Sequence, residues 1–428
     1  MTEQEIAGLG PAFASYLGRF RNCFRQKRIA AHFDSYCRGL LSDLPRKSVE
    51  PIALEAGTAV RTLQEFLVTA QWDHEGARTR LHRDLAATVA ALPADAVGTV
   101  GVIDETSCQK WGAHTPGVQR QYLGCVGKVD NGIVTVHVAV AKGDFQALLD
   151  ADLYLPQSWD GDRERCRAAG IPDTVVYRPK WRIALDQLVR LADHGLSFDW
   201  LVFDEGYGSA VPFLQILGLA GQKFVAEIPV NFAVRTRAGG HSQRADERLT
   251  AADARNGRRQ RLAHRTVGDS VWRVRSATVW VVDRPHTLIV AINEATAEIK
   301  YFLTNATGET LARVLTVAFR RWTVEHSFRL AKQEAGLMHY EGRDYTGLTR
   351  HLILTLVVLG FVAGQTRRLR GEKSTGDGRT SMPSTQPTIG ASIPSSPQDP
   401  AIAAHEPNPP IPPAPQRTSR EVPQETAA

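Results

Sequence analysis

Two short apolar runs, each leading directly into an aspartate, place the strongest constraint on the fold of this chain. The run VGVI precedes Asp104, and the run WLVF precedes Asp204, which lies about 100 residues later. Short apolar runs of this kind are typical of strands that are buried on both faces of a sheet. The sequence therefore predicts two core strands that each end at an acidic side chain.

The segments between these two strands predict a mixed sheet. Residues 121–129 and 133–141 are strand-like, and they flank Asp130-Asn131-Gly132, a strong signal for the turn of a β-hairpin. Apolar residues at helical spacing predict a helix over residues 181–194. Antiparallel strands followed by alternating helix and strand form the element order of an α/β fold with an RNase H-like mixed sheet.

The first 95 residues differ in pattern from the rest of the chain. They carry apolar residues at helical spacing and no alternating run, so residues 1–95 are predicted to form an all-helical domain, which we expect to bind DNA. Within it, the segment RFRNCFRQKR (residues 19–28) interleaves basic residues with Phe20 and Phe24. As a helix this segment could bind DNA phosphates, or it could be a solvated face over two core aromatic residues.

A basic segment interrupts the pattern of helices and strands further along the chain. Residues 231–265 contain nine arginines against three acidic residues, which predicts a basic loop or insertion. Such a loop could bind DNA phosphates or simply be solvated. Strand-like runs then return at 271–282, 287–292 and 298–303, and a helix is predicted from about residue 310 to residue 334.

The C-terminal segment is poor in large apolar residues. Residues 371–428 hold twelve of the chain's 23 prolines, mixed with Ser, Thr, Gln and Ala. This composition cannot bury enough surface to offset the entropy of ordering, so a disordered Pro/Ser-rich tail is expected. The apolar segment before it, residues 352–363, is too short to span a bilayer and is predicted to be a core helix.

Charge and cysteine content restrict the class of protein only weakly. The net charge of +6 favours a polyanionic partner such as DNA without requiring one. The five cysteines form no CxxC pair, so neither a zinc site nor a disulfide framework is indicated. The N-terminal sequence MTEQEI has two acidic residues and no apolar run, unlike a signal peptide. A cytoplasmic, nucleoid-associated protein is expected.

Asp104 and Asp204 are candidate metal ligands, because phosphodiester cleavage needs carboxylates that converge from different elements. Two Mg²⁺ ions about 3.5–4 Å apart can activate a water molecule and stabilise the leaving alkoxide. Mg²⁺ prefers oxygen ligands and keeps several waters, so three acidic side chains suffice. Each aspartate taken alone could equally begin a turn. The neighbouring Glu105 and Glu205 are further candidates, although strand alternation puts each on the opposite face from its aspartate.

A third acidic residue lies in the segment RRWTVEHSFRLAK of the predicted helix. Arg321, Glu325 and Lys332 are separated by three and six residues, and at about 100° per residue they fall within about 40° of one another. One helix face therefore presents an acid between two cations. An ordinary Arg–Glu pair on a surface helix is the alternative, but it leaves Trp322 and the aligned Lys332 unexplained.

Over roughly residues 35–365 the chain resembles the insertion-sequence transposases of the DDE superfamily. The resemblance rests on four segments: the strand into Asp104, RQYLGCVGKVDNG, the strand that continues as VFDEGYG, and RRWTVEHSFRLAK followed by GLMHYEGRDY. It implies that Asp104, Asp204 and Glu325 hold two Mg²⁺ ions, for which Mn²⁺ can substitute. It also implies strands inserted at about 231–305, within a catalytic domain that spans residues 96–370.

The last acid of that family lies in a Tyr-x2-Arg-x3-Glu-x6-Lys signature. Arg321, Glu325 and Lys332 match it, whereas the tyrosine position is Ala318, so one DNA contact of the signature is missing. The resemblance implies that Arg321, Trp322 and Lys332 bind DNA. Trp322 would help to hold a flipped base, since bases stack on aromatic rings; a core tryptophan is the alternative.

The function implied by the resemblance is that of a DNA transposase, which cleaves the ends of its element and joins the 3′-OH to target DNA. Pairing two ends implies a homodimer on DNA. Two alternatives stay open: an RNase H-fold nuclease without strand transfer, and a catalytically inactive DNA-binding relic of a transposase.

Overall fold

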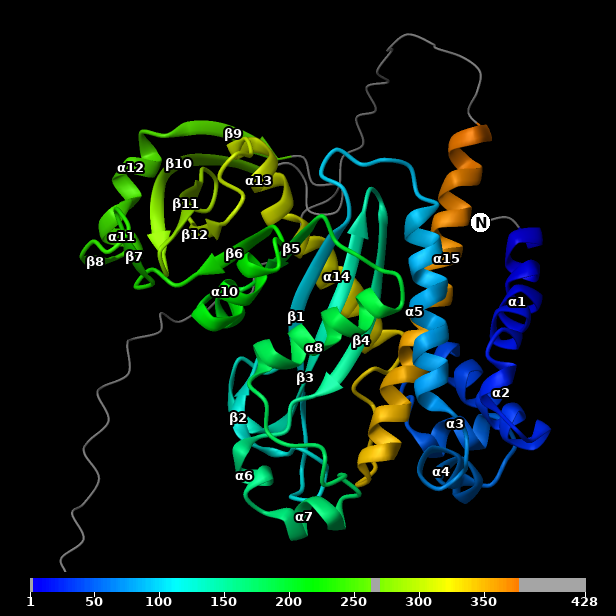
Figure 1. The fold of residues 1–428 in the computed structure, drawn as a ribbon. Coiled ribbons are helices and arrows are strands. Elements are labelled where there is room, and N and C mark those ends of the chain that lie inside the picture. Colours follow the sequence, from blue (N-terminus) through cyan, green and yellow to red (C-terminus); the bar gives the residue numbers. More distant parts are fainter. Residues whose placement is uncertain (1–2, 263–269, 377–428) are drawn as a thin grey trace, which may run out of the picture. The chain divides into compact units, whose positions relative to one another are not determined.

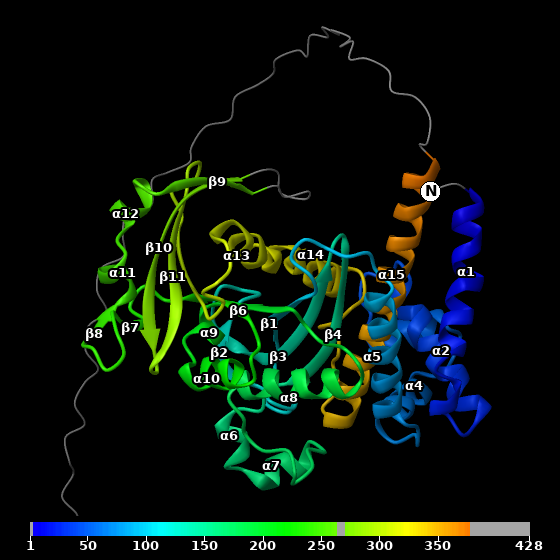
Figure 2. The same cartoon turned by 45° about the horizontal axis from the view of Figure 1, so that its top comes forward.

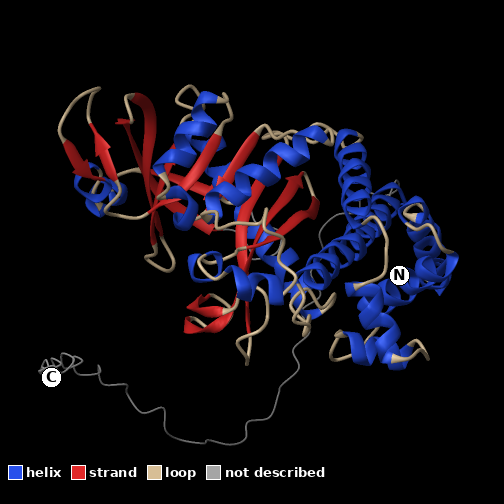
Figure 3. Ribbon diagram, turned by 60° about the horizontal axis from the view of Figure 1, so that its bottom comes forward, coloured by secondary structure: helices blue, strands red, loops and turns tan. Residues whose placement is uncertain are grey.

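A computed structural model describes the protein over residues 3–262 and 270–376. Its N-terminal region is helical, as the sequence predicts, and contains none of the strands seen elsewhere in the described chain (Figures 1 and 3). The helices of this region are α1 (Glu3–Gly18), η1 (Arg21–Cys23), α2 (Lys27–Leu41), α3 (Val49–Glu55), α4 (Val60–Val68) and α5 (His74–Ala90).

The basic segment 19–28 does not form one helix. It contains the turn after α1, the short η1 and the start of α2. Phe20 and Phe24 are buried and pack against Phe33, with ring centroids 5.8 and 4.9 Å apart. The two aromatic residues therefore anchor a bend in the chain, and the prediction of a single basic, aromatic helix is wrong.

Six strands form the first part of a mixed sheet. They are β1 (Val100–Gln109), β2 (Gln119–Leu123), β3 (Lys128–Lys142), β4 (Phe145–Leu153), β5 (Trp200–Phe203) and β6 (Phe224–Ile228). β3 is antiparallel to β1, and β2 and β4 pair with successive parts of β3. On the other side, β5 is parallel to β1 and β6 is parallel to β5. The across-sheet order is thus β4-β3-β1-β5-β6, with β2 beside the far end of β3.

Two details of the predicted strands are wrong. β1 continues to Gln109, so Asp104 lies within the strand rather than at its end. The hairpin turn between β2 and β3 falls at residues 124–127, where Gly127 has a positive φ of 67°, and Asp130-Asn131-Gly132 belongs to β3. Gly132 is there for close packing, because a Cβ at this position would lie 2.4 Å from the carbonyl oxygen of Cys108.

Helices cover both faces of this sheet (Figure 2). α8 (Lys180–Asp193), close to the predicted 181–194, lies on one face, where Gln187 donates to the carbonyl of Val136 at 2.9 Å. α14 (Arg320–Gln333) lies on the other, where Phe328 packs edge-on against His137. The remaining helices near the sheet are α6 (Gln157–Asp160), α7 (Arg163–Ala168), α9 (Glu205–Gly208), α10 (Val211–Leu219) and α13 (Leu311–Ala318).

Further strands extend the sheet beyond β6. β12 (Ile299–Thr304) pairs with β6, and β11 (Arg284–Asn293) and β10 (Ser270–Val281) come next. These three strands confirm the runs predicted at 271–282, 287–292 and 298–303. The segment predicted as a basic loop or insertion contains short regular elements, which are β7 (Ala233–Arg235), β8 (Ser242–Arg244), α11 (Ala245–Arg248), α12 (Ala251–Arg255) and β9 (Arg258–Leu262). Residues 263–265 of that prediction lie outside the described residues.

The last helix, α15 (Tyr345–Gly376), joins the N-terminal helices to the rest of the protein. It packs against α2, α4, α5 and β4, and Tyr16 donates a hydrogen bond to the carbonyl of Val357 at 2.9 Å. Residues 345–369 are long and apolar enough to cross a membrane by composition, but 72% of the most apolar window is buried inside the protein. The prediction of a core helix holds, while the argument from its short length does not. Residues 377–428 of the predicted tail lie outside the described residues.

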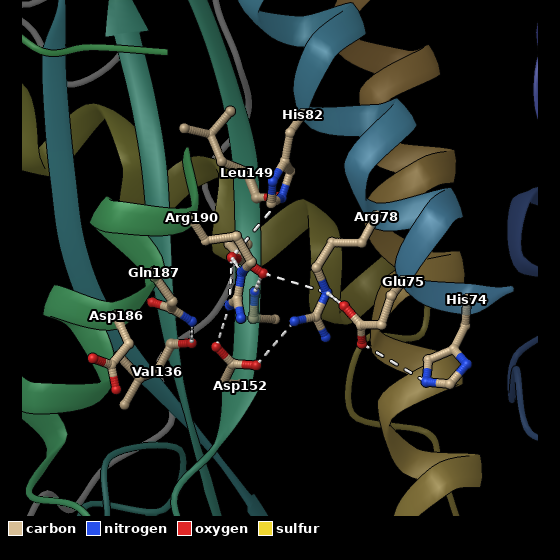
Figure 4. Close-up of polar contacts among 12 residues, drawn as sticks. His74, Glu75, Arg78, His82, Val136, Leu149, Asp152, Asp186, Gln187 and Arg190 are labelled. Carbon is tan, nitrogen blue, oxygen red and sulfur yellow. Dashed lines mark hydrogen bonds and ion pairs between the residues drawn. The ribbon is translucent and has the colours of Figure 1, made fainter. Parts of the chain in front are cut away.

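A buried ionic cluster links α5, β4 and α8 (Figure 4). Arg190 contacts Asp150 at 2.6 Å, and Arg78 contacts Asp152 at 3.3 Å. The Asp150 side chain is fully buried and that of Arg78 is 4% exposed. Burial alone would raise the pKa of Asp152, but Arg78 and Arg190 outweigh it and hold the pKa well below its usual range. The cluster therefore couples the N-terminal helices to the sheet through mutually dependent charges.

His82 makes this interface sensitive to acid. Burial, reinforced by Arg190 and Arg78, lowers the pKa of His82 to about 4 against the opposing charge of Asp150. Its Nε2 donates to the carbonyl of Leu149 at 3.1 Å, which leaves Nδ1 as the acceptor from His194 at 2.9 Å. Folding thus requires the neutral ring.

Acidification is expected to destabilise the protein through His82. In the unfolded chain the ring has a pKa of about 6.5. The contribution of the neutral ring to the free energy of unfolding is therefore complete above about pH 6.5, and roughly 3 kcal/mol of it is lost as the pH falls towards 4. Urea unfolding between pH 8 and pH 4 measures this loss, and His82→Gln, which keeps a donor without a titrating group, should flatten the slope. Equal slopes for both proteins would exclude His82 as the cause.

Candidate active site

The structure brings Asp104 and Asp204 together. β1 and β5 run parallel, and Ile103 pairs with Phe203; Asp104 is the next residue of β1, and Asp204 directly follows the end of β5. Asp204 also caps α9, where it accepts a hydrogen bond from the backbone N–H of Gly206 at 3.0 Å. Two acids that are 100 positions apart in the sequence are therefore neighbours in the interior of the sheet, where β5 ends beside the middle of β1.

The environment of Asp104 opposes its negative charge. Burial is the largest influence and the nearby charge of Asp204 is the second, and together they raise the pKa of Asp104 to about 7, although Arg321 acts in the opposite direction. A pair of carboxylates arranged in this way is stabilised by a cation.

Arg321 on α14 supplies one such cation to the site. Its guanidinium lies 3.6 Å from the carboxylate of Asp104 and 3.4 Å from that of Glu325. Its other amino group lies 3.5 Å from the carboxylate of Glu227 on β6. Glu325 is the most open of these groups, since its side chain is 58% exposed. The structure therefore connects Asp104 and Glu325 through a shared arginine.

Lys332 and Trp322 lie on the same helix as Arg321 and make other contacts. The charge of Lys332 acts on Cys108 of β1 and on His137 of β3, which pairs with Asp104. The half-buried Trp322 ring packs against Phe319, with ring centroids 4.5 Å apart. One part of the Trp322 ring is therefore core, in agreement with the alternative interpretation, while another part stays accessible.

The signature helix itself is interrupted. The sequence predicts one helix over residues 310–334, but α13 ends at Ala318 and α14 begins at Arg320. Ala318, at the signature's tyrosine position, is 5% exposed and belongs to the core. Phe319, the single residue between the two helices, keeps φ −79° and ψ −5°, and its N–H donates to the carbonyl of Leu315 at 3.0 Å, so the interruption is slight. α14 packs on β1, where Arg321 reaches Asp104.

Glu227 is a site residue that the sequence interpretation missed. It contacts Lys300 at 2.5 Å as well as Arg321, and it is 12% exposed. A signal was available, because FVAEI places one acid within an otherwise apolar strand, and such an acid needs a buried partner. Glu105 is a contrasting case, since it lies on the opposite face and pairs with Lys180 of α8 at 2.7 Å.

The donor set of the site consists of oxygen atoms. Within residues 3–262 and 270–376 no three acidic, histidine or cysteine side chains cluster closely enough to form a metal cage. Asp104 and Asp204 are nonetheless adjacent, and Glu325 is linked to them through Arg321. Mg²⁺ is commonly bound by one or two carboxylates plus substrate phosphates and water, so this donor set fits it.

Comparison of the sequence with known proteins identifies a family and a relative. Residues 19–281 match the DDE superfamily endonuclease family. A probable transposase for insertion sequence element IS701 from Microchaete diplosiphon is 30% identical over 230 residues, which is 53% of this chain and 56% of that protein. The alignment thus spans just over half the length of that relative. Because the family match covers more than half of the chain, including both aspartates, the protein belongs to the DDE superfamily of endonucleases.

Proposed function

We propose that this protein is the transposase of an insertion sequence, cleaving the ends of its element and joining the 3′-OH to target DNA. The observation that carries the proposal is the adjacency of Asp104 and Asp204 on parallel strands, below a helix that presents Arg321 and Glu325. The similarity to a probable insertion-sequence transposase supports it. The protein would act on DNA as a homodimer in the cytoplasm, at the nucleoid.

The domain assignment forms part of the same proposal. The strands β4-β3-β1-β5-β6 have the order and directions of an RNase H-like core. Residues 96–370 would form the catalytic domain, with residues 231–305 inserted before the signature helix. Residues 1–95 would bind DNA, although α15 also contributes to the core of that helical region.

Asp104, Asp204 and Glu325 would hold two Mg²⁺ ions, for which Mn²⁺ can substitute. When bound, such ions make a water or a 3′-OH nucleophilic and stabilise the leaving oxygen. The chain needs no nucleophilic side chain of its own, because DNA and water supply the reacting oxygens.

The cations of α14 would position the DNA. Glu227 holds Arg321 from one side, so its guanidinium is directed at the site and would bind a phosphate beside the scissile bond. Lys332, about three turns further along the helix, would bind a phosphate further along the DNA. Trp322 has its ring backed by Phe319 and would stack on an unpaired base.

Strand transfer distinguishes a transposase from its alternatives. Purified protein, incubated with Mg²⁺ or Mn²⁺, a pre-cut element end and a supercoiled plasmid, is expected to join the end to the plasmid, and EDTA should abolish the joining. Sequencing of the junctions measures the reaction. Cleavage without joining would indicate a nuclease, and DNA binding without either reaction would indicate an inactive relic; each result contradicts the proposal.

A further inference from the structure

Trp111 and Tyr122 are the exposed aromatic side chains of the described chain. Trp111 is 90% exposed and Tyr122 is 61% exposed. Both lie at the far end of β1 and β3, where Val126 and Val129 add two more exposed apolar side chains. Apolar groups that gather on the surface in this way mark sites of interaction.

The strand register puts Tyr122 on the same face of the sheet as Asp104. Asp104 pairs with His137, and Tyr122 pairs with Val129, eight residues before His137 on β3. Because side chains alternate along a strand and direct partners share a face, Asp104, His137, Val129 and Tyr122 all lie on one face. This is the face that α14 crosses.

Asn131 holds the loop that carries Trp111 beside the same face. Asn131 lies two residues after Val129 on β3, so its side chain is on the same face of the sheet, and it pairs with Arg120 of β2. Its side-chain amide donates to the carbonyls of Lys110 at 2.7 Å and Gly112 at 3.0 Å, the two residues that flank Trp111. The loop that carries Trp111 is therefore held next to Arg120. We call the surface formed by Trp111, Arg120, Tyr122 and Val129 the hairpin face.

The charges around the hairpin face are positive. Arg120 is exposed on the face itself. Lys110 and Lys332 both act on Cys108, which lies on the same side of β1 as Asp104, four residues further along the strand. The nearest acid along the hairpin, Asp130, has its side chain on the opposite face of the sheet. There its carboxylate lies 3.2 Å from the amino group of Lys128 and accepts a hydrogen bond from the Gln109 amide at 3.0 Å. Cations interspersed with accessible aromatic rings form a surface that suits a nucleic acid.

We propose that the hairpin face binds the DNA that flanks the cleavage site, with Trp111 and Tyr122 stacking on bases and Arg120 contacting a phosphate. This inference rests on the proposed function, since it extends the DNA path from the active site along the sheet. β1 runs five residues from Asp104 to Gln109, roughly 17 Å at about 3.4 Å per residue. With a rise of about 3.4 Å per base pair, the contact falls about five base pairs from the scissile bond.

A second copy of the chain fits the hairpin face less well than DNA does. A twofold interface places the same patch on both partners, so Arg120 and Lys110 of each copy would approach the same cations of the other. The four residues of the hairpin face include no acid that could compensate these cations.

Binding measurements test the hairpin face directly. Affinity for a fluorescein-labelled, random-sequence duplex with frayed ends is measured by anisotropy in Ca²⁺ and in EDTA. Trp111→Ala and Tyr122→Ala are each expected to weaken binding roughly five- to fifty-fold. Trp111→Phe and Tyr122→Phe keep a ring and should stay within about threefold. Val189→Ala, at a 55% exposed position on α8 over the opposite face of the sheet, should have no effect.

Fluorescence supplies a readout that does not depend on affinity. Acrylamide quenching of the wild type minus that of Trp111→Phe isolates the emission of Trp111, and bound DNA should protect it. Equal affinity of the alanine variants, continued quenching of Trp111 on DNA, or a change of oligomeric state without a change in DNA affinity would each overturn the hairpin face as a DNA contact. A wild-type protein without measurable DNA affinity would instead overturn the proposed function.

Discussion

Replacing Asp104 by asparagine is expected to abolish cleavage and strand transfer while leaving DNA binding intact. Asparagine keeps the shape of the side chain but removes the charge that would hold a divalent cation beside Asp204. Loss of that electrostatic stabilisation amounts to several kcal/mol, so cleavage should fall by about 10³-fold or more. Nicking of a labelled element end measures the rate, and anisotropy in Ca²⁺ measures the affinity. Asp204→Asn and Glu325→Gln should behave in the same way.

Glu105→Gln provides a matched control for this prediction. Glu105 adjoins Asp104 in the sequence but lies on the opposite face of β1, where Lys180 binds it. Its replacement removes the same charge at nearly the same place in the chain and should leave cleavage within a fewfold of wild type. Wild-type cleavage by Asp104→Asn, Asp204→Asn or Glu325→Gln would remove that residue from the active site.

Replacing Arg78 by alanine is expected to cost about 3–5 kcal/mol of folding free energy, because it leaves buried carboxylates without their partner. Asp150 is fully buried and Asp152 is 19% exposed, and Arg190 alone would then have to neutralise both. A loss of this size approaches the whole stability of many domains. Urea unfolding at pH 7.5, followed by tryptophan fluorescence, measures it.

Arg80 lies on the same helix as Arg78 and tests whether burial is the cause. Its side chain is 42% exposed and pairs with Asp84 at 3.0 Å. Exposed ion pairs contribute little, so Arg80→Ala should change the unfolding free energy by less than about 1 kcal/mol. Similar losses for Arg78→Ala and Arg80→Ala would show that the ionic cluster has no special role in stability.

Local patterns were sufficient for many elements and for several members of the candidate site. The apolar runs before Asp104 and Asp204 correspond to strands, and the spacing of Arg321, Glu325 and Lys332 corresponds to a helix with one charged face. Each of these patterns lies within a short stretch of the chain, so it can be recognised from neighbouring residues alone. Asp130-Asn131-Gly132 misled the prediction for the same reason, since its turn propensity is local. Its place in β3 depends instead on pairing with β1 and β2.

Glu227 shows the opposite situation. Nothing within its own strand identifies its partners, because Lys300 and Arg321 come from elements that lie more than 70 residues later. The hairpin face has the same origin, since Trp111 and Tyr122 come together only through the register of β1, β2 and β3. Long-range pairings of this kind leave no periodic trace in the sequence.

The amino-acid sequence by itself determined the main strands and helices and the acidic and basic residue types available for chemistry, because periodicity and turn propensity act over a few neighbouring positions. Only the tertiary structure decided which of these residues meet. Parallel pairing of β1 and β5 made neighbours of Asp104 and Asp204, and the packing of α14 on β1 brought Arg321 over Asp104. Sheet register and helix packing depend on burial of the whole core, a property that no single segment carries.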